Sequence, residues 1–369
     1  MNATHQLHKL GQSIWLDNIT RELLTSGTLA RYINELSVTG LTSNPTIFDN
    51  AIRNGNFYDE AIRRKTLAGK SGEALFFELA LEDLTQAADL FRQIHDITGG
   101  IDGWVSLEVS PLLADNTVDT ITAAAQLHAL AQGPNLFIKI PGTPAGIPAI
   151  EESIFAGVPI NVTLLFSREH YIAAAEAYMR GIERRLAAGL NPRVASVASI
   201  FVSRWDVSVN KKPQGKFLNN RLGIAIATRT YKAYHDLLAS ERWQKLAFSG
   251  ALPQRLLWGS TGTKDPAASD TLYVEALAAP DTINTLPEKT LLAFAEHGKI
   301  SDVLSIDEGC TEAAEAIISE FNREGVNDQE LAAELQRQGT ESFAKSWNVL
   351  IACIASKSNE FTQNHLSGK

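Results

Sequence analysis

The chain has 369 residues, of which 44% are hydrophobic and 20% charged, as in ordinary soluble globular proteins, and its length allows roughly one to three domains. Its 33 basic and 42 acidic residues give a formal net charge of -9, which argues against a nucleic-acid-binding surface but allows a local pocket for one small phosphate. Two cysteines without metal-ligand spacing predict neither a disulfide framework nor a zinc site. The N-terminus lacks a signal-like apolar core and no long apolar run occurs, so we expect a cytoplasmic protein that does not enter membranes.

Short apolar runs alternate with longer helical patterns along the chain. We expect strands at 13–18, 40–44, 103–110, 136–140, 160–166, 194–202, 255–260 and 282–286. Helical patterns lie between them, for example at 112–131, 167–189, 221–238 and 266–277. Alternating strands and helices form parallel sheets, and eight such units in about 290 residues fit a closed (β/α)₈ barrel.

We therefore predict an α/β protein, a TIM barrel with additional N- and C-terminal helices, that forms a single domain over residues 1–369. The barrel strands are expected within about 13–287. The segment 288–369 contains no further strong strand. Its helices, including 307–323 and 329–357, are expected to pack on the outside of the barrel.

Polar side chains share one face of several predicted strands. Residues i and i+2 of a strand lie on the same face, so Ser106, Glu108 and Ser110 lie together. The same alternation pairs Asn161 with Thr163, Thr42 with Asn44, Trp15 with Asp17, and Phe137 with Lys139. Polar groups inside a barrel are costly unless they are hydrogen bonded. Their number therefore predicts an active site at the C-terminal mouth, where barrel enzymes place their catalytic residues.

Lys139 is the most unusual of these residues, because it lies within the apolar sequence Leu136-Phe-Ile-Lys-Ile-Pro141. Lysine is almost never fully buried unless it is paired. It could protect an exposed strand edge or extend its amine to water. Alternatively, burial disfavours the charged form, and a neutral amine can attack a ketone to give an iminium, which accepts electrons when the neighbouring C–C bond breaks.

Three further polar residues each have a structural and a catalytic interpretation. Glu108 can be an ion-pair partner, or it can move protons for Lys139 through a water molecule while the carbinolamine forms and dehydrates. Asp17 can cap the helical segment 19–36, or it can be the base that deprotonates the hydroxyl whose carbon leaves as an aldehyde. Asn44, kept extended by Pro45, can be a cap or turn residue, or it can bind a substrate hydroxyl.

Two loops contain groups that suit a phosphate. Arg204 ends the sequence Ser199-Ile-Phe-Val-Ser-Arg204, and Gly259-Ser-Thr-Gly-Thr-Lys-Asp265 follows the next strand. A guanidinium pairs well with phosphate, a glycine-rich turn can point N–H groups at an anion, and late loops of barrels often bind phosphate. Each loop can equally be a surface turn, and neither matches a P-loop.

Several segments together resemble the transaldolase family. They occur in the family's order and are Trp15-Leu-Asp17, Gly40-Leu-Thr-Ser-Asn-Pro-Thr-Ile-Phe48, Ser106-Leu-Glu-Val-Ser110, Phe137-Ile-Lys-Ile-Pro141, Pro159-Ile-Asn-Val-Thr-Leu164 and Ser199-Ile-Phe-Val-Ser-Arg204. Thr263-Lys-Asp-Pro266, Asp270-Thr-Leu-Tyr273 and Asp281-Thr-Ile-Asn-Thr285 extend the likeness to the last strand. The length of the chain is similar to that of the longer bacterial-type subgroup.

The resemblance implies a transferase that works through a Schiff base and moves a dihydroxyacetone unit. The donors are sedoheptulose 7-phosphate and fructose 6-phosphate, and the acceptors are glyceraldehyde 3-phosphate and erythrose 4-phosphate. This reaction belongs to the non-oxidative pentose phosphate pathway of carbohydrate metabolism. The resemblance implies sugar phosphates as substrates and no metal or organic cofactor. We expect a monomer or homodimer that binds neither nucleic acid nor a membrane.

The resemblance also implies a role for each candidate residue. Lys139 is the Schiff-base lysine, Glu108 the water-assisted acid and base, and Asp17 the base for the cleaved hydroxyl. Asn44, Asn161, Ser199 and the catalytic residue Thr163 bind the dihydroxyacetone hydroxyls or the catalytic water. Arg204 holds the phosphate, and Phe201 lines the pocket.

Two positions depart from the family pattern. Ser203 stands where many relatives have glycine, and this exchange can shift the loop of Arg204. Better-known members have a second phosphate-binding arginine after the seventh strand, and Lys264 is the candidate for it in this chain. A lysine is a point charge and cannot reproduce a bidentate clamp.

Two alternatives to transaldolase activity stay open at this point. One is a related aldolase that forms the same Schiff base but releases free dihydroxyacetone. The other is a barrel that binds sugar phosphates as a sensor or scaffold without turnover.

Overall fold

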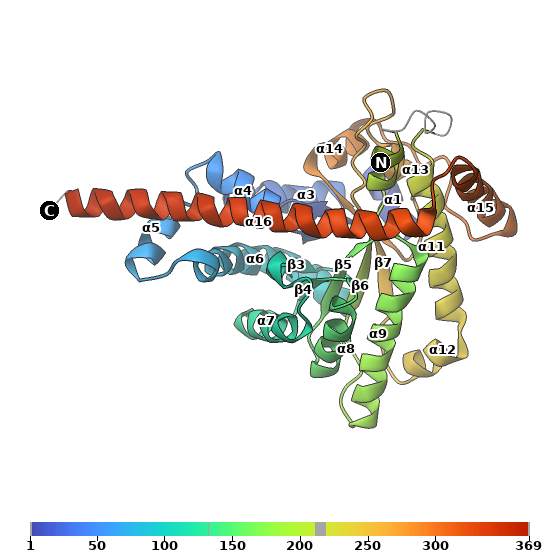
Figure 1. Cartoon of the computed structure of the whole chain (residues 1–369), viewed down its shortest axis with the longest axis horizontal. Helices are drawn as coiled ribbons and strands as arrows, with labels where there is room; N and C mark the ends of the chain where they lie inside the picture. The colour runs from blue at the N-terminus through green and yellow to red at the C-terminus, as the bar shows by residue number, and fades with distance from the viewer. Residues whose placement is uncertain (1, 132, 211–218, 368–369) are drawn as a thin grey trace.

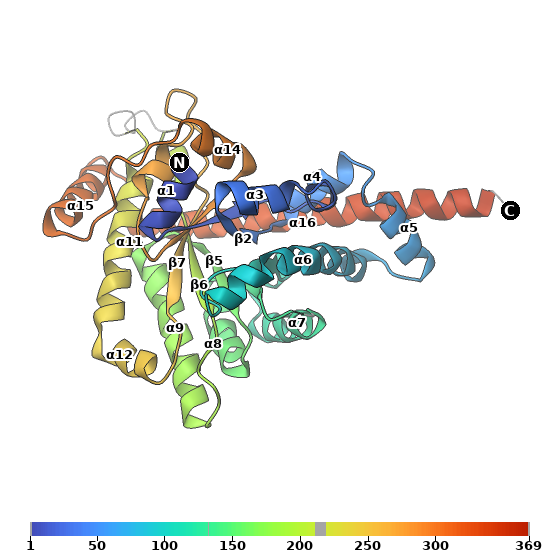
Figure 2. The ribbon, with the colours of Figure 1, turned by 180° about the vertical axis from the view of Figure 1, so that it is seen from behind.

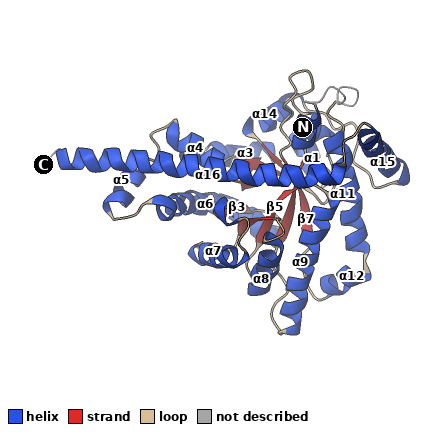
Figure 3. Ribbon diagram, viewed as in Figure 1, coloured by secondary structure: helices blue, strands red, loops and turns tan. Residues whose placement is uncertain are grey.

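The computed structural model describes residues 2–131, 133–210 and 219–367. Eight parallel strands close into a barrel in the order β1-β2-β3-β4-β5-β6-β7-β8. Helices surround these strands (Figure 3). The strands are β1 (Ser13–Asp17), β2 (Val38–Thr42), β3 (Val105–Glu108), β4 (Leu136–Pro141), β5 (Ile160–Leu165), β6 (Ser196–Phe201), β7 (Gln254–Gly259) and β8 (Ile283–Leu286). The predicted (β/α)₈ fold is confirmed, and each strand overlaps the segment where it was expected.

Helices connect and surround the strands. They are α1 (Ala3–Leu10), α2 (Arg21–Thr25), α3 (Thr28–Leu36), α4 (Pro45–Arg53), α5 (Asp59–Leu67), α6 (Gly72–Ile97), the short 3₁₀ helix η1 (Pro111–Leu113), α7 (Thr117–Leu130), α8 (Gly146–Ala156), α9 (Arg168–Ala187), α10 (Ser203–Val209), α11 (Leu222–Ala239), α12 (Glu241–Phe248), α13 (Leu272–Ala276), α14 (Glu288–His297), α15 (Glu308–Arg323) and α16 (Asp328–Ser367). Within the described ranges, no helix combines the length and the apolar character needed to cross a bilayer.

The helix expected at 266–277 is mostly wrong, because only α13 is helical there. The side chain of Asp265 accepts a hydrogen bond from the N–H of Ala267 (2.9 Å), and that of Ser269 accepts one from the N–H of Thr271 (3.3 Å). Such local bonds offer the backbone an alternative to the helical ladder. They delay the start of the helix to Leu272.

Large apolar side chains fill the lower part of the barrel. Trp15, Phe137, Val197, Leu257 and Ile283 belong to one buried cluster inside it. Gly40 on β2 is required by this packing, because a Cβ there would lie 2.7 Å from the Trp15 ring. The interior is therefore closed below, and a cavity can open only at the C-terminal ends of the strands.

The register of the strands gathers polar residues at those ends. Asp17 on β1 is the partner of Thr42 on β2, Glu108 on β3 is the partner of Lys139 on β4, and Lys139 is the partner of Asn161 on β5. Adjacent strands of a parallel sheet carry such partners side by side. The sequence alternation thus places these polar groups next to one another above the apolar layer.

The long helix α16 is one of the C-terminal helices expected to pack on the outside of the barrel. It contacts β5 and α10 and extends beside α4, α5 and α6 (Figures 1 and 2). Leu335 and Phe343 of α16 join Leu164, Phe201 and Trp205 in one buried cluster. By contrast, α14 contacts α1, β1 and β8, and α15 contacts α11. The helix α16 therefore reaches the end of the barrel where the polar residues lie.

Candidate active site

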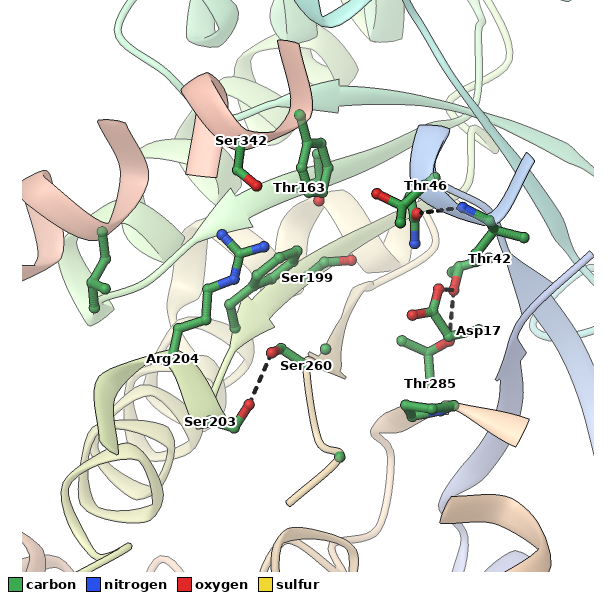
Figure 4. Close-up of a pocket in the computed structure, with 18 of the residues that line it drawn as sticks. Asp17, Thr42, Thr46, Thr163, Ser199, Ser203, Arg204, Ser260, Thr285 and Ser342 are labelled. Carbon is green, nitrogen blue, oxygen red and sulfur yellow. Dashed lines mark hydrogen bonds between the residues drawn. The ribbon is translucent and has the colours of Figure 1, made fainter. Parts of the chain in front are cut away.

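A cavity of about 960 Å³ opens at the C-terminal end of the barrel. Most of the predicted site residues line it, namely Asp17, Asn44, Lys139, Thr163, Ser199, Phe201, Arg204 and Lys264. Figure 4 shows Asp17, Thr163, Ser199 and Arg204 around this cavity. The other two, Glu108 and Asn161, are buried directly behind it. The barrel thus gathers residues from seven strands and the loops that follow them around one space.

Lys139 is held at the wall of this cavity by two hydrogen bonds. Its Nζ donates to Glu108 Oε2 (3.1 Å) and to the carbonyl oxygen of Ser43 (3.3 Å), and the residue is only 5% exposed. β4 pairs with β3 on one side and with β5 on the other, so it is no edge strand. The edge and snorkelling interpretations are therefore wrong, and Lys139 is a buried, paired lysine that borders a cavity.

Glu108 contacts Lys139 directly, whereas we expected a water molecule between them. Burial raises the pKa of Glu108, and the Lys139 ammonium opposes this shift. The negative charge of Asp17 adds to the rise. A carboxyl with a raised pKa can both accept and return a proton at neutral pH. Glu108 is thus placed to take the proton from Lys139 and to leave a neutral amine.

Asp17 faces the cavity from the end of β1. Thr42 Oγ1 donates to Asp17 Oδ1 (2.8 Å), and the hydroxyls of Thr42 and Thr285 lie 2.7 Å apart (Figure 4). Burial raises the pKa of Asp17, while the charges of Lys139 and Lys264 and the bond from Thr42 lower it. The capping interpretation is wrong, because Thr20 caps α2 by accepting from the N–H of Leu23 (2.9 Å). The Asp17 carboxylate is oriented toward the cavity by threonines and is fit to act as a base.

Asn44 caps a helix and also lies at the cavity. Its Oδ1 accepts from the N–H of Ile47 (3.2 Å) and caps α4, which begins at Pro45. The same residue lines the cavity. Since only the oxygen is needed for the cap, the amide N–H groups can donate to a ligand hydroxyl.

Polar side chains from β3, β5 and β6 form a chain of hydrogen bonds under the cavity. Ser199 Oγ donates to Asn161 Oδ1 (2.7 Å), and Asn161 Nδ2 donates to Ser106 Oγ (3.1 Å). Thr163 Oγ1 is buried, and within the described part of the chain it has no hydrogen-bond partner. Buried hydroxyls are almost always satisfied. Thr163 is therefore the group in this wall that most needs a ligand hydroxyl or a water molecule.

Arg204 places a positive charge at the cavity, on the side opposite Asp17 (Figure 4). It lies at the start of α10, and its guanidinium carbon is 5.3 Å from the centre of the Phe201 ring and 5.9 Å from that of Phe343. No described carboxylate forms an ion pair with it, and burial lowers its pKa. A half-buried guanidinium held by aromatic rings favours an incoming anion such as a phosphate.

The two departures from the family pattern line the same cavity as Arg204. Ser203 Oγ is 3.0 Å from Ser260 Oγ, so the serine ties the loop after β6 to the loop after β7 (Figure 4). Lys264 is exposed and lines the same cavity from the loop after β7. From this position Lys264 can make a second contact to an anion, but its single ammonium group cannot make the bidentate contact of an arginine.

Residues from α16 complete the cavity wall and were not predicted from the sequence. They are Leu335, Gln338, Ser342 and Phe343. Thr285 on β8 was also missed, although it follows the polar alternation of the other strands. No local pattern in α16 distinguishes a helix that covers a barrel mouth from one that packs on its side. Among the described residues, no group of three or more His, Cys, Asp or Glu could hold a metal ion.

Comparison with known proteins identifies relatives that match most of the chain. A family model described as Transaldolase/Fructose-6-phosphate aldolase matches residues 14–354. A protein named Transaldolase from Renibacterium salmoninarum is 42% identical over 355 residues, which cover 94% of each chain. One named Transaldolase 2 from Streptomyces coelicolor is 41% identical over 358 residues, or 95% of each chain. One named Transaldolase from Thermobifida fusca is 42% identical over 357 residues, covering 95% of this chain and 96% of the relative.

Proposed function

The chain belongs to the transaldolase/fructose-6-phosphate aldolase family, and we propose that it acts as a transaldolase with Lys139 as its Schiff-base residue. One observation carries the assignment of the site. The buried pair of Lys139 and Glu108 borders a cavity that also holds the carboxylate of Asp17 and the guanidinium of Arg204, with which no described carboxylate pairs. Imine chemistry needs an amine and a proton carrier, bond cleavage needs a base, and a sugar phosphate needs a cation.

The first step forms the imine. Glu108 takes a proton from Lys139, and the neutral Nζ adds to the ketose carbonyl to give a carbinolamine. Glu108 then returns the proton to the carbinolamine oxygen, which leaves as water, and an iminium remains on Lys139. The direct contact of 3.1 Å between Lys139 Nζ and Glu108 Oε2 supports this exchange.

The second step breaks the C–C bond. Asp17 takes the proton from the substrate hydroxyl, and the bond breaks between the hydroxyl-bearing carbon and the carbon next to the former ketone carbon. Its electron pair moves into the iminium to form an enamine. The hydroxyl carbon leaves as an aldehyde. The enamine then attacks the aldehyde of the acceptor, and the same steps in reverse release the new ketose. Asn44, Asn161, Thr163 and Ser199 supply hydrogen bonds to the bound three-carbon unit.

Substrates for this site are sugar phosphates. We propose fructose 6-phosphate and sedoheptulose 7-phosphate as donors, and erythrose 4-phosphate and glyceraldehyde 3-phosphate as acceptors, in the non-oxidative pentose phosphate pathway. Arg204 holds the phosphate, and Lys264 adds a second positive charge.

We propose that residues 1–369 work as a single domain, since α16 carries part of the cavity wall. The cytoplasmic location and the monomeric or dimeric state stay predictions.

A transfer assay separates this function from its two alternatives. With fructose 6-phosphate and erythrose 4-phosphate, we expect sedoheptulose 7-phosphate and glyceraldehyde 3-phosphate in equal amounts, without free dihydroxyacetone. Release of dihydroxyacetone as the main product would identify the aldolase alternative. Binding of fructose 6-phosphate without any product would identify a sensor or scaffold.

Replacing Arg204 tests the phosphate site. Arg204→Ala is expected to raise KM for fructose 6-phosphate by about 100-fold, because a charge-assisted contact to the phosphate is lost. The KM for unphosphorylated fructose should change little, because that substrate never makes the contact. Steady-state kinetics with both donors measures the difference. An equal rise for both substrates would remove Arg204 from the phosphate site.

A further inference from the structure

One face of α16 lies over the residues that are proposed to bind phosphate. Gln336, Gly339 and Phe343 are spaced by three and four residues, so they share one face of the helix. Each of the three is buried. We call this set the Gln336–Gly339–Phe343 face.

Gly339 lets the backbone of α16 approach the guanidinium closely. A Cβ at this position would lie 3.3 Å from Arg204 Nη1 and 2.9 Å from Leu164 Cδ2. The first distance is tighter than ordinary van der Waals contact, and the second requires the Leu164 methyl to move. The space that a methyl group would fill is therefore occupied by Arg204 and Leu164.

Phe343 lies beside two of the positively charged groups of the site, Lys139 and Arg204. The centre of its ring is 5.5 Å from Lys139 Nζ and 5.9 Å from Arg204 Cζ. It also packs on Phe201, whose ring centre is 6.5 Å away. Cations within about 6 Å of a ring centre are attracted by its π face. Arg204, which has no described carboxylate partner, is thus oriented by Phe201 from the barrel and by Phe343 from α16.

Gln336 fixes this part of α16 to the barrel. Its Nε2 donates to the carbonyl oxygens of Gly142 and Leu164, each at 3.0 Å. Leu164 has a φ of 57°, a left-handed conformation that is strained for leucine, and it follows Thr163 directly. One hydrogen bond therefore ties the helix to the residue after β4, and the other ties it to an irregular point of β5 next to Thr163, whose hydroxyl has no partner among the described residues.

We propose that the Gln336–Gly339–Phe343 face makes α16 part of the donor-binding site, and that Gly339 and Phe343 are positioning residues that hold Arg204 for the phosphate of the sugar. This inference rests on the proposed function of Arg204 as the phosphate ligand. Neither residue has a reactive group, so both act through Arg204. The two hydrogen bonds of Gln336 hold α16 in place above the cavity.

The first test adds a methyl group to the helix. Gly339→Ala is expected to lower the ratio of kcat/KM for fructose 6-phosphate to that for fructose by about tenfold, because the guanidinium is displaced from the phosphate position. Alanine favours a helix over glycine, so a purely structural effect would not lower this ratio. Gly309→Ala is the matched control, because a Cβ there lies no closer than 3.6 Å to its nearest neighbour, Asp307 Oδ1.

The second test removes the aromatic ring and restores it. Phe343→Leu keeps an apolar side chain but has no π face, and it should also lower the ratio for fructose 6-phosphate over fructose. Phe343→Tyr keeps the ring and should restore the ratio to within about twofold of the wild type. Thermal denaturation of every variant shows whether the fold is intact.

The outcomes separate this inference from the proposed function. If the wild type transfers dihydroxyacetone and both Gly339→Ala and Phe343→Leu leave the ratio unchanged, the positioning role is wrong while the function stands. An equal loss of activity with fructose 6-phosphate and with fructose likewise contradicts the positioning role. If the wild type itself makes no transfer product, the proposed function fails.

Discussion

Lys139→Ala is expected to lower kcat for dihydroxyacetone transfer by about 10⁴-fold or more, because the variant has no amine with which to form the iminium. The same variant should no longer be trapped by borohydride in the presence of fructose 6-phosphate. Burial already raises the pKa of Glu108, so the carboxyl can become neutral when its partner is removed. Lys139→Met keeps the approximate length of the side chain and should show the same loss, which would exclude misfolding as the cause.

Lys264 provides the matched control for this prediction. Among the described residues it is the other lysine that lines the cavity, and it is exposed. Lys264→Ala should weaken the binding of phosphorylated substrates but still form a borohydride-stable adduct. If the adduct instead persists in Lys139→Ala and disappears in Lys264→Ala, the nucleophile is misassigned.

Asp17→Ala is expected to separate imine formation from bond cleavage. The variant should still be trapped by borohydride with fructose 6-phosphate, because Lys139 and Glu108 are intact. Its kcat for transfer should fall by about 10²–10⁴-fold, the usual contribution of a general base. Single-turnover kinetics with a rapid borohydride quench measures the two steps. A variant that forms no imine would contradict this division of roles.

The ionisation of Asp17 also predicts a pH dependence. The base must be ionised to accept a proton, and burial raises its pKa. The kcat of the wild type should therefore fall as the pH is lowered through this raised pKa. Asp17→Ala should lose this acidic limb of the profile. A limb that persists unchanged in the variant would have to come from another group, such as Glu108.

Much of the barrel and of its inner polar ring could be predicted from local patterns. Apolar runs of strand length alternate with helices, and the period of two places Glu108, Lys139 and Asn161 on the inner face. The strand register then brings these side chains together without further information. Sequence reasoning succeeded there because the geometry of a parallel barrel allows few other arrangements.

Contacts between distant segments could not be predicted in the same way. The Gln336–Gly339–Phe343 face meets Arg204 and Leu164 only after the whole barrel has closed. The hydrogen bond between Ser203 and Ser260 likewise joins two loops, and it gives the unusual serine a partner. The direct contact of Glu108 with Lys139 depends on side-chain conformations that alternation alone does not determine.

Identification of the modified residue tests the central assignment most directly. The wild-type chain is incubated with fructose 6-phosphate, reduced with borohydride, digested, and analysed by mass spectrometry. We expect one adduct with the mass of a reduced dihydroxyacetone or hexose phosphate imine, located on Lys139. An adduct on any other lysine, or none while transfer activity is intact, would contradict the assignment of Lys139 as the Schiff-base residue.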